Sequence, residues 1–219
     1  MKLAVFGGTF NPVHIGHLAM ADDVCTSMGY DKILFVPAFI PPHKIASDME
    51  SPENRIAMLK AAFKDDKRFE VEPCEIERGG TSYTIDTIKY VIEKYKGQLE
   101  GKVGLLLGQE NASEFDKWRE CDTIAELCDL IVARRIKVDN VNIKGFENTS
   151  TGYYTGGFEN TADEKIDLPY NFIMLKNQIM PLSSTEIRAR IAENNGWRYL
   201  VSAGVFEYIV DNKLYGFKN

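Results

Sequence analysis

Residues 7–17 read Gly7-Gly8-Thr9-Phe10-Asn11-Pro12-Val13-His14-Ile15-Gly16-His17, and this stretch guides the interpretation of the whole chain. It follows the apolar run Leu3–Phe6, which is typical of a buried strand. Apolar residues then recur at helical spacing, at Ile15, Leu18, Val24 and Met28. A strand, two glycines and a helix start can together offer backbone N–H groups to a phosphate. Because His14 and His17 would project from one face of the helix start, the stretch predicts a site that holds a polyphosphate and helps it react.

The composition is that of an ordinary globular protein. The chain has 219 residues, of which 44% are hydrophobic and 26% charged, enough for one core with a small appendage. Its net charge of −6 argues against broad, sequence-independent nucleic-acid binding, which needs a basic surface. A nucleotide is still compatible with this charge, because a few local cations and helix N-termini are enough to bind it. We therefore expect no nucleic acid among the partners.

The cysteines and the apolar segments indicate where the protein works. The four cysteines form no C-x-x-C pair and have no zinc-like spacing with histidine, so we expect free thiols that are buried as small hydrophobic groups. The apolar run Leu3–Phe6 is too short for a secretory signal. No segment approaches the length of a membrane span. We therefore expect a cytoplasmic protein that has no membrane partner.

Apolar runs alternate with helical patterns along most of the chain. We expect strands over residues 3–6, 32–37, 69–72, 103–107, 130–133 and 171–176, and helices from residue 15 and over 53–63, 83–95, 185–193 and 205–210. Such alternation predicts an α/β fold with a doubly wound parallel sheet. Continuous apolar strands favour burial on both faces of the sheet. No linker separates two domains, so residues 1–219 are predicted to form one domain with a small C-terminal helical part.

Residues 137–170 interrupt this pattern with a polar insertion. The pentapeptide Gly145–Thr149 recurs unchanged as Gly157–Thr161. The spacing of the two copies is far too short for a solenoid, so we favour a duplicated surface loop or hairpin over a mobile flap. The aromatic residues of the insertion leave self-association into a homo-oligomer open.

A second motif lies near the C-terminus, in Leu182-Ser183-Ser184-Thr185-Glu186-Ile187-Arg188. Ser183 and Glu186 have the spacing of a capping box, which predicts a helix start. The free N–H groups, the hydroxyls and Arg188 could hold the outer phosphates of a triphosphate or a departing pyrophosphate. Taken alone, a capped helix with a solvated arginine is at least as good an explanation. The pairing with residues 7–17 favours phosphate binding.

Together the two motifs resemble the H-x-G-H nucleotidyltransferase superfamily and, within it, bacterial nicotinate-nucleotide adenylyltransferases. The resemblance covers nearly the whole chain outside residues 137–170. It includes Pro42-His43-Lys44, Thr81-Ser82-Tyr83-Thr84, Leu107-Gly108 with Trp118, Ala133-Arg134 and the ending from Val205 to Tyr215. That family has a Rossmann-like fold and, with Mg²⁺, joins ATP to nicotinate mononucleotide, giving deamido-NAD and pyrophosphate. The resemblance therefore implies that ATP and nicotinate mononucleotide are the substrates and that Mg²⁺ accompanies ATP.

The resemblance also implies roles for particular residues. The catalytic group at the reacting phosphates would be His14, His17, Lys44 and Arg188. The ATP site would contain Gly7, Gly8, Thr9, Phe10, Gly108, Glu110, Arg134, Ser183 and Ser184. The mononucleotide would contact Asn11, Thr84 and Trp118. No residue is assigned as a metal ligand.

Some positions depart from the family or allow a plainer interpretation. Glu110 stands where the family has Asp, and Arg134 is followed by Arg135-Ile136 rather than Pro-Gly. Lys44 would otherwise be a solvated lysine, and Trp118 a core residue. His43 stays undecided between loop hydrogen bonding and phosphate contact.

The implied reaction is an in-line displacement on the α-phosphorus of ATP. The attacking group is an ionised phosphate, so the histidines need not act as bases, and charge stabilisation and positioning suffice. Pantetheine-phosphate adenylyltransferase is the nearest alternative, although it typically reads Gly-Ser-Phe-Asp-Pro where this chain has Gly-Thr-Phe-Asn-Pro. A class I aminoacyl-tRNA synthetase lacks support, because no K-M-S-K-S-like segment is present. A nucleotide sensor without activity, and nicotinamide mononucleotide as the preferred acceptor, stay open.

Overall fold

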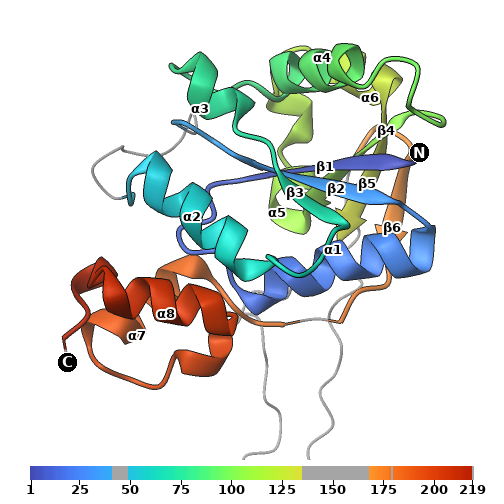
Figure 1. Cartoon of the computed structure of the whole chain (residues 1–219). Coiled ribbons are helices and arrows are strands. Elements are labelled where there is room, and N and C mark those ends of the chain that lie inside the picture. Colours follow the sequence, from blue (N-terminus) through green and yellow to red (C-terminus); the bar gives the residue numbers. More distant parts are fainter. Residues whose placement is uncertain (41–48, 135–167, 179, 219) are drawn as a thin grey trace, which may run out of the picture.

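The computed structural model describes residues 1–40, 49–134, 168–178 and 180–218. Within these ranges the chain forms a parallel sheet of six strands in the order β3-β2-β1-β4-β5-β6 (Figure 1). The strands are β1 (Leu3–Gly8), β2 (Lys32–Pro37), β3 (Phe69–Val71), β4 (Val103–Gly108), β5 (Cys128–Ala133) and β6 (Phe172–Leu175). This strand order is that of the Rossmann fold, so the predicted doubly wound parallel sheet is confirmed.

Helices connect these strands and follow the last one. They are α1 (Ile15–Met28), α2 (Pro52–Ala62), α3 (Cys74–Arg78), α4 (Thr84–Lys94), α5 (Gln109–Ala112), α6 (Cys121–Leu127), α7 (Ser184–Ala192) and α8 (Ala203–Asp211). Single 3-10 turns occur at η2 (Phe115–Lys117), η5 (Arg198–Leu200) and η6 (Leu214–Gly216). The long helices were predicted from their spacing. The short helices α3, α5 and α6 were not, because so few turns leave no clear period in the sequence.

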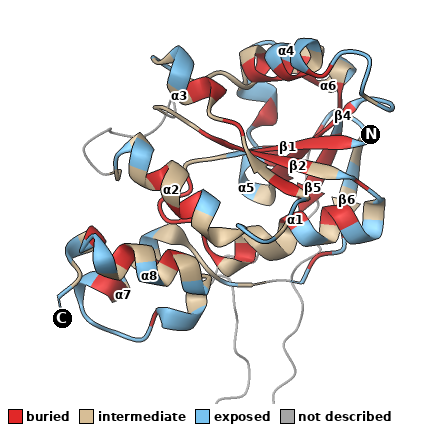
Figure 2. Cartoon of the chain, viewed as in Figure 1, coloured by how far each residue is buried: buried red, intermediate tan, exposed pale blue. Residues whose placement is uncertain are grey.

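The sheet is buried on both faces, as its continuous apolar strands predict. Along β1, Ala4 and Phe6 belong to a cluster that includes residues of α1, α2, α7 and α8, whereas Leu3 and Val5 belong to a second cluster with α4 and α6. Figure 1 shows α1 and α2 on one side of the sheet and α4 and α6 on the other, and Figure 2 shows the buried strands between them. The C-terminal helices therefore share a core with the first half of the chain.

The winding direction of the sheet reverses between β1 and β4. From β1 the chain proceeds outward through β2 and β3, and from β4 outward through β5 and β6. β1 pairs with β2 from Leu3 to Gly8, whereas its register with β4 pairs Ala4 with Gly104 and Val5 with Leu105. The carboxyl ends of β1 and β4 therefore flank the point where the strand order reverses, which is where ligands bind in open α/β sheets.

Several expectations need correction or lie outside the described residues. The third strand ends at Val71, and the carboxylate of Glu72 is buried and accepts a hydrogen bond from Lys94 Nζ at 2.5 Å. All four thiols are free, but Cys121 is only half-buried and accepts a hydrogen bond from the Tyr170 hydroxyl at 3.3 Å. Lys44, His43 and both copies of the repeated pentapeptide lie outside the described residues. In the part of the chain that is described, no helix is long and apolar enough to cross a membrane.

Candidate active site

The connection from β1 to α1 places the two histidines of the H-x-G-H motif side by side. Their rings stack with centroids 3.7 Å apart at 27°, as their spacing predicts. The backbone N–H of His14 donates to Nδ1 of His17 at 3.2 Å. Because this nitrogen accepts, a neutral His17 ring carries its proton on Nε2, the nitrogen farther from the backbone. His17 is therefore set up as a hydrogen-bond donor through Nε2.

The three glycines of this connection differ in what a side chain at each position would meet. A Cβ on Gly8 would stand 2.8 Å from the ring of Phe10, so the absence of a side chain at this position makes room for the Phe10 ring. A Cβ on Gly16 would come within 3.1 Å of the His14 ring, which explains the glycine inside H-x-G-H. A Cβ on Gly7 would meet nothing within 4 Å. Gly7 is thus the glycine that leaves open space at the end of β1.

Phe10 is a core residue within the loop. It is 2% exposed, and its ring packs on Phe6, Phe35 and His17 with centroid distances of 5.4, 5.5 and 5.2 Å. Its φ of 50° lies in the left-handed region and turns the chain immediately after Thr9. The ring therefore anchors the loop to the sheet and supports one side of the His17 imidazole.

The start of α7 lies against the same loop. The Ser184 hydroxyl donates to the carbonyl of Pro12 at 2.9 Å, and Arg188 Nη1 donates to the carbonyl of Asn11 at 2.8 Å. Ser183 caps the helix, since its Oγ accepts from the N–H of Glu186 at 3.1 Å. The two motifs that are far apart in sequence therefore form one structural unit.

The predicted capping box forms only in part. The Ser183 side of the box is present, but the Glu186 carboxylate accepts from Nη2 and Nε of Arg190 at 2.9 and 3.0 Å. Both nitrogens of this arginine, one turn later in the helix, donate to the same carboxylate oxygen, Oε1 of Glu186, and a charged donor binds a carboxylate more strongly than a neutral backbone N–H does.

Asn11 is held by residues that sequence reasoning did not single out. Its side chain is 3% exposed, and its Oδ1 accepts from the Tyr215 hydroxyl at 2.9 Å and from the N–H of Glu50 at 3.2 Å. Burial raises the pKa of Tyr215 well above its ordinary value, so the phenol keeps the proton that it donates. No local pattern marks Tyr215, because its role depends on a contact with the opposite end of the chain.

Three further candidates for the ATP site lie at the carboxyl ends of β4 and β5. Gly108 ends β4, and Glu110 follows in the first turn of α5 with an exposed side chain. Arg134 follows β5, and its backbone N–H and C=O pair with the side chain of Asn177 at 2.8 and 3.1 Å. Gly7 and Gly108 thus stand at the ends of the two central strands, with Arg134 one strand farther along the same edge.

Thr84 and Trp118 come from adjoining segments of the chain. Thr84 is the first residue of α4, and Trp118 directly follows η2 and packs on Phe115 with ring centroids 5.4 Å apart. Arg119 lies over the ring of Tyr83 at 4.9 Å, which joins the two segments. They form a second group of candidate residues, apart from the unit made by residues 7–17 and α7.

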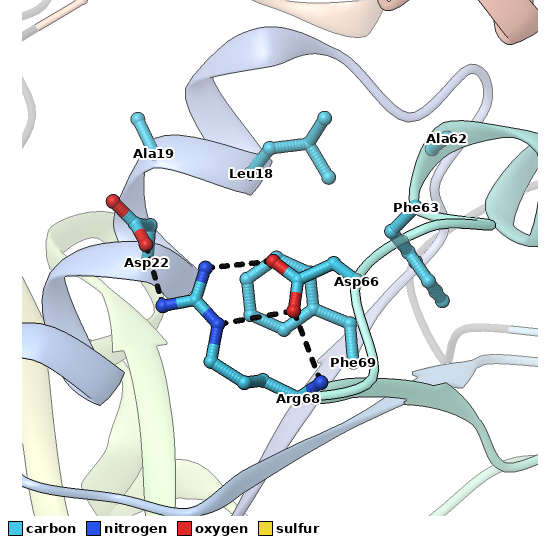
Figure 3. Close-up of a pocket in the computed structure, with 8 residues that line it drawn as sticks. All are labelled: Leu18, Ala19, Asp22, Ala62, Phe63, Asp66, Arg68 and Phe69. Carbon is cyan, nitrogen blue, oxygen red and sulfur yellow. Dashed lines mark hydrogen bonds and ion pairs between the residues drawn. The ribbon is translucent and has the colours of Figure 1, made fainter.

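A hollow of about 420 Å³ opens elsewhere, between α1 and the connection from α2 to β3 (Figure 3). It is lined by Leu18, Ala19, Asp22, Ala62, Phe63, Asp66, Arg68 and Phe69. Arg68 pairs with Asp66 at 2.6 Å and with Asp22 at 2.8 Å, as Figure 3 shows. None of the residues predicted for the substrates lines this hollow, so it is not the candidate site.

Among the described residues, no group of three or more His, Cys, Asp or Glu side chains is arranged to hold a metal ion. The loop of residues 7–17 and the start of α7 carry backbone N–H groups, hydroxyls, imidazoles and a guanidinium, which are groups that can donate hydrogen bonds to an anion.

Comparison with known proteins assigns this architecture to a class. Residues 5–190 match the model of the cytidylyltransferase-like family, a class of nucleotidyltransferases. A probable nicotinate-nucleotide adenylyltransferase of Treponema pallidum is 39% identical, with 98% of this chain and 99% of the relative covered. The corresponding protein of Caldicellulosiruptor saccharolyticus is 35% identical over 98% of this chain and 99% of its own length. The chain belongs to the nicotinate-nucleotide adenylyltransferase family within the cytidylyltransferase-like class.

Solved structures show the same fold. Plasmodium falciparum nicotinic acid mononucleotide adenylyltransferase complexed with APC matches with a TM-score of 0.69 at 15% identity, covering 99% of this chain and 98% of that one. The complex of that enzyme with NaAD matches with a TM-score of 0.68 at 16% identity and the same coverage. At these identities the likeness concerns the fold alone.

Proposed function

We propose that the protein transfers the adenylyl group of ATP to nicotinate mononucleotide, giving deamido-NAD and pyrophosphate. The observation that carries this proposal is the attachment of α7 to the histidine loop through Ser184 and Arg188. With α7 bound to this loop, the helix N-terminus, the Arg188 guanidinium and the two imidazoles would act together on the phosphates at the end of β1. Family membership, with a relative 39% identical over 98% of this chain, supports the same reaction.

The chemistry needs little beyond positioning and charge. A phosphate oxygen of the mononucleotide attacks the α-phosphorus of ATP, the bond to the β-phosphate breaks, and its electron pair leaves on pyrophosphate. The nucleophile is already ionised, so no residue has to remove a proton from it. The Nε2–H of His17 would donate to phosphate oxygens as negative charge builds up on them. Arg188, Lys44 and His14, whose ring stacks on that of His17, would share that task.

The remaining candidates divide between the two substrates. Gly7 leaves room for a phosphate at the end of β1. The adenosine part of ATP would lie at the ends of the neighbouring strands, near Gly108 and Glu110 at β4 and Arg134 at β5. Thr84 and Trp118 would meet the nicotinate side, with the indole as a stacking surface. Asn11 would act at the mononucleotide through the loop that it anchors. The N-terminus of α7, which Ser183 caps, would bind the outer phosphates of ATP through its backbone N–H groups.

Mg²⁺ enters as part of the substrate, bound to the triphosphate of ATP. We further propose that residues 1–219 act as one nucleotidyltransferase domain and that the protein works in the reducing cytoplasm. The four free thiols are in keeping with that setting.

Pyrophosphate release tests the proposal directly. The purified protein with MgATP is given nicotinate mononucleotide, nicotinamide mononucleotide or phosphopantetheine in parallel reactions. Turnover with nicotinate mononucleotide supports the proposal. Turnover with phosphopantetheine alone would replace it by the pantetheine reaction, and ATP binding without turnover would replace it by a nucleotide sensor.

A further inference from the structure

Arg55 is a buried arginine on α2 whose described hydrogen bonds all end on backbone carbonyl oxygens. Its side chain is 1% exposed. Nη1 donates to the carbonyls of Thr9 at 3.0 Å and Ala38 at 2.7 Å, and Nη2 donates to Phe39 at 3.5 Å. Nε donates to the carbonyl of Glu50 at 3.2 Å. A buried guanidinium is costly to desolvate, so this set of acceptors is what makes its position tolerable.

These carbonyls belong to three separate segments of the chain. Thr9 lies directly after β1, in the loop that leads to the two histidines. Ala38 and Phe39 lie directly after β2, and Glu50 lies just before α2. Only the planar fork of an arginine can hold acceptors in several fixed directions at once, because a lysine is a single point charge.

The segment after β2 is in turn bound to the approach to α4. The N–H of Phe39 donates to the Ser82 hydroxyl at 3.1 Å, and the N–H of Ser82 donates to the carbonyl of Ile40 at 3.3 Å. Ile40 also forms a parallel bridge with Thr81. Ser82 stands two residues before Thr84, the candidate for the mononucleotide side.

Arg55 therefore joins two parts of the proposed site. One is the loop after β1, on the ATP side, and the other is the segment 38–40, which is bonded to the residues just before Thr84 on the mononucleotide side. We propose that Arg55 is a positioning residue that sets the distance between the two substrates for adenylyl transfer. This inference rests on the proposed function, because it needs two substrates that react across that distance. In-line displacement tolerates little error, and a misplacement of about 1 Å costs on the order of a hundredfold in rate.

The test compares Arg55→Lys with Ser82→Ala and with the double variant. Arg55→Lys keeps the charge but cannot hold all four carbonyls, and Ser82→Ala removes only the acceptor of the Phe39 N–H. Arg68→Lys is the matched control, because Arg68 is bonded to Asp22 and Asp66 at the hollow of Figure 3 and touches neither loop. The quantities measured are kcat and both KM values per folded molecule, with a thermal melt of each variant.

We expect kcat of Arg55→Lys to fall by about tenfold to a hundredfold, with each KM changed by less than about threefold. Ser82→Ala should lower kcat by about threefold to tenfold, and the double variant should be no worse than Arg55→Lys, because both act through one connection. Unchanged kcat per folded molecule, or losses that multiply in the double variant, would overturn the proposal. If Arg55→Lys does not fold, unchanged kcat in Ser82→Ala overturns it.

A second readout is independent of turnover. Hydrogen exchange at the amides of Phe39 and Ser82 should be faster in Arg55→Lys than in the wild type and unchanged in Arg68→Lys. Wild-type protein that fails to use nicotinate mononucleotide would refute the proposed function while leaving this exchange result to test the connection. Wild-type turnover together with unchanged exchange in Arg55→Lys would refute the positioning role alone.

Discussion

Arg188 Nη1 donates a hydrogen bond of 2.8 Å to the backbone carbonyl of Asn11, which lies 177 positions earlier in the chain. The same guanidinium reaches Thr185 Oγ1 through Nη2 at 3.4 Å. Arg188 therefore fixes the loop that carries the histidines while keeping its positive charge at the start of α7. A phosphate bound there would meet a prearranged cation, because the loop contact has already ordered the long side chain.

The first prediction concerns His17. We expect His17→Ala to lower kcat by about a hundredfold to a thousandfold, because a donor aimed at developing charge acts mainly in the transition state. The dissociation constant for ATP, measured by calorimetry, should change far less than kcat. An equal loss in kcat and in ATP affinity would indicate that the ring has only a structural task.

The second prediction separates Gly7 from Gly8. Gly7→Ala should fold like the wild type, because its methyl group meets no protein atom within 4 Å, yet it should raise the KM for ATP by filling the space at the end of β1. Gly8→Ala should destabilise the fold by about 1–3 kcal/mol, because its methyl group would collide with the Phe10 ring. Thermal melts and ATP kinetics of both variants check this. A wild-type KM in Gly7→Ala would show that no ligand uses that space.

The third prediction separates Ser183 from Ser184. Ser183→Ala should lower stability by about 1 kcal/mol, since it removes the cap of α7. Ser184→Ala removes the contact with Pro12, so its main effect should be a raised KM for ATP as the two motifs loosen. Urea unfolding and initial-rate kinetics distinguish the two effects. The reverse assignment, with Ser184→Ala the less stable variant, would contradict the structure.

The fourth prediction is a loss of stability in alkali. Burial raises the pKa of Cys25 to about 11 and the pKa values of Cys74 and Cys128 to about 12, from 9.0. A raised pKa in the folded state gives stability that is present below the ordinary value and is lost as the pH rises through the folded values. At pH 10.5 one such thiol removes about 2 kcal/mol from the free energy of unfolding.

Urea unfolding of the wild type and Cys128→Ala at pH 7 and at pH 10.5 tests this prediction. The variant should lose less stability than the wild type between the two pH values. The difference at pH 7 measures the cost of the cavity and serves as the control. Parallel losses in both proteins would show that the Cys128 thiolate forms as readily in the folded state as in the unfolded one.

The sequence was sufficient for the sheet because burial on two faces leaves an unbroken signal. Runs such as Ile33–Val36 and Leu105–Leu107 are apolar at every position, and they proved to lie in β2 and β4, two inner strands of the sheet. The loop 7–17 and the start of α7 were recognisable because turn and capping chemistry needs particular residue types. The contact between them, through Arg188 and Asn11, could only be expected from their shared chemistry.

Arg55 and Tyr215 could not be found in this way. In sequence Arg55 is one charged residue on a helix, and the carbonyls that accept from its buried guanidinium come from three segments, two of which lie 16 or more positions away. Tyr215 contacts Asn11 across 204 positions. Asn177, which completes the end of β5 with its side chain, belongs to the same class. Such roles arise in tertiary packing and have no local pattern.

Competition between the two mononucleotides tests the central claim most directly. The protein is given MgATP with equal concentrations of nicotinate and nicotinamide mononucleotide, and the dinucleotide products are separated and quantified by mass spectrometry. We predict that deamido-NAD forms in large excess over NAD, with one pyrophosphate released per dinucleotide. NAD as the main product, or no dinucleotide at all, would contradict the assignment.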